Sequence, residues 1–139
     1  MKQFTNIRVM LVRENEQPMQ AQIQSQGDAY HAFKHLQDEA QEVLAMIMLD
    51  AKHNVLGYSE VNRGGLNSSI ASPREIAKRA LLSNAHAIIL AHNHPSGDTT
   101  PSKQDLEVTE HIAKALALLE IKLLDHLVIG YNKYHSIMS

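Results

Sequence analysis

Short apolar runs alternate with polar, turn-forming stretches along this 139-residue chain, and the lengths of the runs predict strands. Val43–Leu49 and Ala85–Ala91 are short enough to be buried strands, and each is bounded by polar residues. A polar turn at 50–54 follows Val43–Leu49, and another at 130–133 follows a later apolar segment. Each turn joins two apolar segments into a predicted hairpin. The remaining predicted strands are Val55–Val61, Ile121–Ile129 and Tyr134–Met138, with a looser alternation over Ile7–Val12.

Helices are predicted where a capping residue precedes apolar side chains at helical spacing. We expect Asp28 to cap a helix over Ala29–Gln37, Ser72 and Glu75 to form a capping box for a helix that ends near Ser83, and Ser102 to cap a third helix. Helices interleaved with hairpins and one or two crossovers predict an α/β fold, a mixed sheet with flanking helices. With no internal repeat and no linker, residues 1–139 are predicted to form one domain, in which 1–26 contribute an N-terminal strand and a loop.

Composition excludes several classes of protein. The chain is 44% hydrophobic and 20% charged, which is typical of a globular domain. It contains no Cys, so disulfide scaffolds, thiolate nucleophiles and Cys-based zinc sites are excluded. The net charge of -2 does not favour a nucleic acid as partner. No apolar run approaches the roughly 18–20 residues that span a membrane, and no signal peptide is evident, so we expect a cytoplasmic protein.

Two histidines at a predicted strand end are the main candidates for chemistry. His92 and His94 are two residues apart, so both imidazoles project to the same side of the strand. Asp105 falls in the first turn of the following helix, where its carboxylate can point back toward them. Two imidazoles and a carboxylate form a three-ligand set of the kind that leaves a catalytic zinc an open position. The alternative is that the histidine pair is fortuitous and that Ser102 to Asp105 is an ordinary helix cap.

The wider pattern resembles the JAMM motif of the JAB/MPN metalloprotease superfamily: a distant Glu, then His-x-His-Pro, then Ser-x-x-Asp. The string HNHPSGD at 92–98, SPREI at 72–76 and LDH at 124–126 are similar to the RadC family, named historically as a DNA repair protein. The resemblance covers about residues 42–134. It implies the three-layer JAB/MPN arrangement, which is cytidine-deaminase-like, and one zinc ion per chain, bound by His92, His94 and Asp105.

The same resemblance implies the catalytic roles. Glu42 would be the general acid/base that takes a proton from the zinc-bound water and delivers it to the leaving amine. Ser102 would donate a hydrogen bond to the developing oxyanion. The choice of Glu42 over Glu39 and Glu60 depends on the family pattern, because spacing alone leaves Glu42 open to being a solvated carboxylate. The implied activity is metallopeptidase-like hydrolysis of an unknown peptide or isopeptide-like amide.

Two departures from related patterns limit what the resemblance implies. Asn93 stands where JAMM isopeptidases typically have Ser or Thr, so their substrate class does not transfer. RadC proteins commonly carry an N-terminal helix-hairpin-helix region, and we expect none before Glu42. The alternative function is a DNA-repair-associated nucleic-acid-binding or phosphoesterase module. A zinc deaminase is excluded because its Pro-Cys-x-x-Cys pattern is missing. A homo-oligomer remains open.

Several other polar residues are expected to have structural or solvated roles. Asp125 and His126 lie in an apolar strand, where hydrogen bonding to a loop or support of the metal ligands is favoured. Asp98 is expected to bond its own backbone in a turn. Solvated side chains are expected at Arg74 and Lys103, and a partly buried imidazole at His86.

Overall fold

A five-stranded mixed sheet organises the protein. The computed structural model describes residues 1–16, 21–65 and 72–139. The strand order is β2-β1-β3-β4-β5, with β3 and β4 parallel and all other neighbours antiparallel. The α/β fold with a mixed sheet is therefore confirmed. The elements are α1 (Gln26–Phe33), the 3-10 helix η1 (Lys34–Asp38), β1 (Val43–Leu49), β2 (Val55–Arg63), α2 (Pro73–Leu82), β3 (Ala87–Asn93), α3 (Lys103–Leu118), β4 (Lys122–Gly130) and β5 (Lys133–Ser136).

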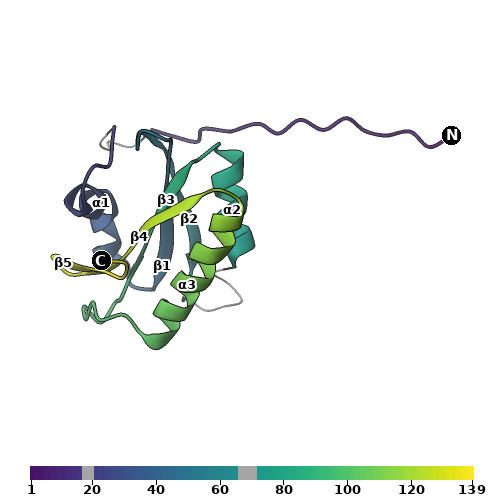
Figure 1. Cartoon of the computed structure of the whole chain (residues 1–139). Coiled ribbons are helices and arrows are strands. Elements are labelled where there is room, and N and C mark those ends of the chain that lie inside the picture. The colour runs from purple at the N-terminus through teal and green to yellow at the C-terminus, as the bar shows by residue number, and fades with distance from the viewer. Residues whose placement is uncertain (17–20, 66–71) are drawn as a thin grey trace.

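Helices cover both faces of the sheet, which gives three layers (Figure 1). Leu44 and Met46 on β1 pack in one apolar cluster with residues of α2 and α3. Ala45 and Ile47, which alternate with them, pack in a second cluster with residues of α1 and η1. All seven residues of β1 are buried, because side chains on both faces of this strand meet a helix layer. A strand covered on both faces needs a continuous apolar run, as the sequence has.

The connections bring the carboxyl end of β3 close to two other segments. Strands β1 and β3 are antiparallel, with Leu44 opposite His92, so the start of β1 lies beside the end of β3. Helix α3 is the crossover between the parallel strands β3 and β4, so its first turn also lies near the end of β3. Both predicted hairpins, β1–β2 and β4–β5, are present. The end of the sheet at which β3 terminates thus brings together residues from three parts of the chain.

The predicted strand over Ile7–Val12 is wrong. Residues 1–16 contain no helix or strand, and the apolar side chains of Ile7, Val9 and Val12 are exposed. In Figure 1 this segment extends away from the body of the protein. The residue types favour an extended backbone, but a strand forms only where a neighbour completes its ladder of hydrogen bonds. The predicted loop from Arg13 to Gln26 lies partly outside the described residues.

Two of the predicted helix starts are shifted or capped differently. Helix α1 begins at Gln26, because the Ser25 hydroxyl accepts a hydrogen bond from the backbone N–H of Asp28; Asp28 is therefore not the N-cap. The Ser72 hydroxyl caps α2 by accepting from the Arg74 N–H. The predicted capping box with Glu75 is absent from this described helix start, and the Glu75 carboxylate pairs with Lys78 instead.

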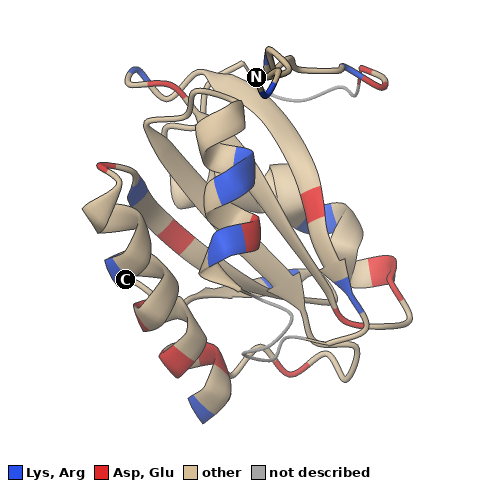
Figure 2. Cartoon of the chain, turned by 90° about the vertical axis from the view of Figure 1, so that its right-hand side faces the viewer, with Lys and Arg blue, Asp and Glu red and all other residues tan. Residues whose placement is uncertain are grey.

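Charged residues of both signs are interspersed along the part of the chain that includes α2 and α3 (Figure 2). Helix α2 carries three basic residues and one acidic residue, whereas α3 carries three acidic and two basic ones. Two of the ion pairs on these helices join neighbouring turns, Lys78 with Glu75 and Lys114 with Glu110. Among the described residues, no helix combines the length and the apolar character needed to cross a membrane.

Candidate metal centre

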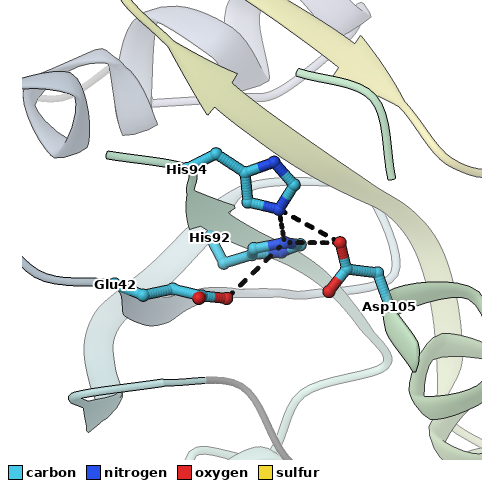
Figure 3. Close-up of side chains that lie close together, drawn as sticks. All are labelled: Glu42, His92, His94 and Asp105. Carbon is cyan, nitrogen blue, oxygen red and sulfur yellow. Dashed lines mark hydrogen bonds and ion pairs between the residues drawn. The ribbon is translucent and has the colours of Figure 1, made fainter. Parts of the chain in front are cut away.

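Four side chains that can bind a metal ion, from three segments of the chain, converge at the carboxyl end of β3 (Figure 3). His92 is the penultimate residue of β3, and His94 follows the strand directly. Asp105 lies in the first turn of α3, and Glu42 immediately precedes β1. One ligating atom from each of the four lies within 4.8 Å of those of the others, so the group could hold a metal ion. The structure therefore brings together all of the predicted ligands and the predicted base.

Three of the four ligating atoms form a small triangle. Nε2 of His92 and Nε2 of His94 are 3.1 Å apart, and Oδ2 of Asp105 lies 3.3 Å from the first and 3.1 Å from the second. A tetrahedral zinc ion with bonds of about 2.0–2.1 Å holds its donor atoms about 3.3–3.4 Å apart. The triangle thus has nearly the dimensions of one face of a zinc site. Oε1 of Glu42 is 3.9 Å from His92 Nε2, so this carboxylate lies beside the triangle.

The His94 ring is oriented by the loop that follows it. Its Nδ1 is 2.7 Å from the backbone oxygen of Asp98, which can only accept, so Nδ1 carries a proton and Nε2 of the neutral ring presents a lone pair. The loop is packed tightly against the end of β4. A Cβ on Gly130 would lie 2.6 Å from the carbonyl oxygen of Gly97, so only glycine allows this approach.

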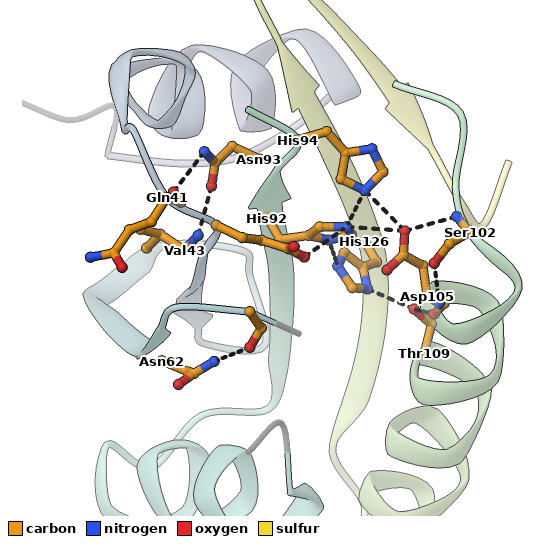
Figure 4. Close-up of polar contacts among 12 residues, drawn as sticks. Gln41, Val43, Asn62, His92, Asn93, His94, Ser102, Asp105, Thr109 and His126 are labelled. Carbon is orange, nitrogen blue, oxygen red and sulfur yellow. Dashed lines mark hydrogen bonds and ion pairs between the residues drawn. The ribbon is translucent and has the colours of Figure 1, made fainter. Parts of the chain in front are cut away.

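The His92 ring is held from the other side, inside the protein (Figure 4). Its Nδ1 is 2.7 Å from Nε2 of His126 on β4, and Nδ1 of His126 is 2.7 Å from the hydroxyl of Thr109 on α3. His92 and His126 are fully buried, and Thr109 is nearly so. Burial lowers the pKa of His126 well below its ordinary value, and the neighbouring His92 lowers it further. His126 thus makes buried hydrogen bonds to His92 and Thr109, which agrees with the structural or ligand-supporting role predicted for it.

Asp105 is fixed by the helix cap that it completes. The Ser102 hydroxyl accepts from the Asp105 N–H at 3.0 Å, and the Ser102 N–H donates to Asp105 Oδ2 at 2.9 Å. Burial by itself would raise the pKa of Asp105, but the contact with His92 and the hydrogen bonds from Ser102 outweigh it, and the pKa lies below its usual range. The ordinary cap and the ligand geometry thus coexist. Ser102 is exposed, and its hydroxyl retains a hydrogen to donate.

Asn93 has a positioning role that sequence reasoning missed. It lies between the two histidines, and because strand side chains alternate it points to the opposite face of β3. Its Oδ1 accepts from the Val43 N–H at 2.7 Å, and its Nδ2 donates to the Gln41 carbonyl at 3.1 Å, so Asn93 bonds the residues on both sides of Glu42 (Figure 4). Only the strand alternation could have indicated this from the sequence.

The other singled-out residues lie outside the group. Asp125 accepts hydrogen bonds from the Ser136 hydroxyl and the His126 N–H, as expected of a structural residue. The Asp98 carboxylate accepts from the Thr100 N–H, and that bond lowers its pKa. The side chain of Lys103 is 91% exposed. His86 is exposed and precedes β3, so the expected partial burial of this ring is wrong, because the strand begins only at Ala87.

A separate hollow lies along β2 and is lined in part by His35, Tyr58 and Glu60. It includes none of the four residues of the candidate centre. The His35 Nε2 is 2.9 Å from the Tyr58 hydroxyl, and burial raises the pKa of Tyr58 to about 12. The hollow and the candidate centre are thus distinct features of the surface.

Comparison with known proteins places the chain in a family. The family model described as "RadC-like JAB domain" matches residues 23–139, a longer range than the 42–134 covered by the sequence resemblance. A UPF0758 protein of Clostridium perfringens is 47% identical over 97 residues, covering 70% of this chain and 43% of the relative. One from Legionella pneumophila strain Corby is 44% identical over 124 residues, covering 87% of this chain and 55% of the relative.

A third relative, a UPF0758 protein of Ralstonia pickettii, is 38% identical over 122 residues, covering 82% of this chain and 54% of the relative. The chain spans about half the length of the curated relatives it matches. The fold, the four converging side chains and the match over residues 23–139 agree with one another. The chain belongs to the RadC-like JAB domain family.

Proposed function

We propose that this protein is a zinc-dependent hydrolase of the JAMM type that cleaves amide bonds in a peptide or isopeptide-like substrate. His92, His94 and Asp105 would bind the zinc ion, one per chain. The proposal is carried by one observation: three ligating atoms form a triangle with sides of 3.1–3.3 Å, and a carboxylate lies beside it.

The electrostatics of the triangle support a cation. The Asp98 carbonyl leaves Nε2 of His94 with a lone pair, and this lone pair faces the Asp105 carboxylate. Acceptor atoms about 3 Å apart repel one another unless positive charge lies between them. A proton or a metal ion can supply that charge. The donor set of two imidazoles and one carboxylate is typical of catalytic zinc, which keeps one position open.

The chain's own groups can then divide the work of amide hydrolysis. Zinc, when bound, acidifies water and polarises a carbonyl. Glu42 would accept the proton of the attacking water and deliver it to the leaving nitrogen; its side chain is 26% exposed, so substrate can reach it. Ser102 would donate its hydroxyl hydrogen to the oxygen of the attacked carbonyl. No side chain forms a covalent bond with the substrate in this scheme.

The test combines metal analysis with an unbiased search for cleavage. Protein purified without added metal should contain about one zinc per chain by elemental analysis. The zinc-loaded protein is then incubated with a peptide library and with lysine-linked isopeptides in water enriched in oxygen-18. New carboxylates carrying the heavy isotope, formed by the unaltered protein and not by Glu42→Gln, would support the proposal. Equal labelling by both proteins, or a protein that binds no zinc, would contradict it.

A further inference from the structure

In the candidate centre, the direction of the hydrogen bond between His92 and His126 is set by the residues around it. His92 meets His126 ring to ring, and either nitrogen of such a pair can be the donor. The direction matters, because a neutral His92 that accepts at Nδ1 carries its proton on Nε2, which is the atom that faces Asp105. Only a His92 that donates from Nδ1 offers Nε2 as a ligand. His94 has no such ambiguity, since its Nδ1 meets a carbonyl oxygen.

The hydrogen bonds of the Thr109 hydroxyl, beyond His126, can have only one direction. The Thr109 hydroxyl is 2.7 Å from the backbone oxygen of Asp105 and 2.7 Å from Nδ1 of His126. A carbonyl oxygen can only accept, so the hydroxyl donates its single hydrogen to Asp105. The same hydroxyl must then accept from Nδ1 of His126. With that proton on Nδ1, Nε2 of the neutral His126 ring is the acceptor for His92.

The reverse direction is less favourable. If His126 donated to His92, the Thr109 hydroxyl would have to donate to His126. Its oxygen would then face the Asp105 carbonyl oxygen at 2.7 Å with no hydrogen between them. The hydrogen bond to the Asp105 carbonyl would be lost inside a region where His92 and His126 are fully buried and Thr109 is 4% exposed. A bond from His92 Nε2 to His94 Nε2, which lies 3.1 Å away, would replace it only at the metal position, where a bound metal ion has to displace it. Unsatisfied polar atoms are costly in such surroundings.

We infer that Thr109 and His126 are positioning residues that fix the tautomer of His92, with the proton on Nδ1 and the lone pair of Nε2 directed at the metal position. The chain of bonds starts at one proposed ligand, His92, and ends at the backbone of another, Asp105. It also joins β3, β4 and α3 through their side chains. This inference rests on the proposed zinc site for its purpose, although the tautomer itself is a property of the metal-free protein.

The experiment compares Thr109→Val, which keeps the shape and removes the hydroxyl, with Thr109→Ser, which keeps the hydroxyl. Protein labelled with nitrogen-15 in its histidines is examined without metal at about pH 8.5, two units above the ordinary pKa of histidine. Two-bond proton–nitrogen correlations identify the nitrogen that carries the proton. We expect an Nδ1–H tautomer for His92 in the unaltered protein and in Thr109→Ser, and a mixture or the Nε2–H tautomer in Thr109→Val.

Zinc affinity, measured by competition with a chelating indicator, gives a second readout. We expect Thr109→Val to bind zinc about tenfold more weakly or worse and Thr109→Ser to remain within about threefold of the unaltered protein. An Nε2–H tautomer in the unaltered protein, or unchanged tautomer and affinity in Thr109→Val, would overturn the inference. If Thr109→Val fails to fold, the tautomer of the unaltered protein still decides. A protein with the expected tautomer that binds no zinc would contradict the proposed function alone.

Discussion

The ligand side and the base side of the candidate site are held in place in different ways. The side chains of His92 and Asp105 are 0% and 5% exposed. Each side chain is fixed by a hydrogen bond with another residue, His92 with His126 and Asp105 with the Ser102 N–H. Glu42 is 26% exposed and lies just before β1. Its position depends on Asn93, which bonds the backbone of the residues on either side of it.

This difference follows from what each side has to do. Metal ligands must converge to within a few tenths of an ångström before the ion binds, so rigid, buried support is an advantage. A group that carries a proton between two atoms needs access to substrate and some freedom to move. If this interpretation is right, metal binding and proton transfer can be disturbed separately, and the following variants test that separation from the largest effect to the smallest.

The largest effect is expected from His94→Ala. Removing one of three proposed ligands should abolish most zinc binding and, with it, all hydrolysis, because the remaining two donors hold the ion weakly. Elemental analysis after dialysis measures the loss. His135→Ala, which alters an exposed histidine on β5, is the control and should retain its zinc. Full zinc retention by His94→Ala would show that the triangle is not the metal site.

The second effect, from Glu42→Gln, should be confined to the rate. Loss of a general base costs about a hundredfold or more, while the triangle of ligands is untouched. The variant should therefore contain as much zinc as the unaltered protein and hydrolyse substrate at most about one hundredth as fast. Glu39→Gln is a matched control on the same segment, because Glu39 pairs with Arg63. Equal loss of zinc and of activity would make Glu42 a ligand and remove the distinction between the two sides.

The convergence of His92, His94 and Asp105 could be predicted from the sequence because its signals are local. Two histidines at a spacing of two and an aspartate in a helix first turn are placed by strand and helix geometry alone. Glu42 could not be placed in that way. It is separated from His92 by 49 intervening residues, and only the antiparallel register of β1 against β3 brings them together. The family pattern supplied what spacing could not.

The wrong strand prediction has the same non-local origin. Ile7–Val12 has residues that favour a strand, but whether they form one depends on a partner edge elsewhere in the chain. The error at the first helix is local: Ser25 and Asp28 are both residue types that favour the N-cap, and the structure has Ser25 there, with its hydroxyl accepting from the Asp28 N–H. Asn93 was noticed only as a departure from a family pattern, because its function depends on which segment crosses the far face of β3.

A smaller effect on the base side is expected from Asn93→Ala. The Val43 N–H would lose its acceptor in a buried position, at a cost of about 1–3 kcal/mol in the free energy of unfolding. Misplacement of Glu42 should slow hydrolysis about tenfold to a hundredfold with zinc content unchanged. Asn15→Ala, at an exposed asparagine, is the control. Loss of zinc without a change in rate per bound zinc would show that Asn93 serves the ligands instead.

The smallest effect on function, and the matching test of the ligand side, is expected from Gly130→Ala. The added Cβ would lie 2.6 Å from the Gly97 carbonyl oxygen and 2.7 Å from Cγ2 of Thr99, so the loop must move. Overpacking of this kind costs about 1–3 kcal/mol in the free energy of unfolding, which denaturant titration measures. The loop carries the Asp98 carbonyl that orients His94, so zinc affinity should fall, by less than about tenfold because all three ligands remain.

Gly57→Ala is the control for that variant, because its added Cβ would meet only the terminal methyl group of Met48, at an ordinary contact distance of 3.4 Å. It should change neither zinc affinity nor the rate per bound zinc. Gly130→Ala should also leave the rate per bound zinc close to that of the unaltered protein, since the segment carrying Glu42 is bonded to Asn93 on the far face of β3. A variant at Gly130 that binds zinc normally but hydrolyses slowly would show that the two sides of the site are mechanically coupled, and the comparison drawn above would fail.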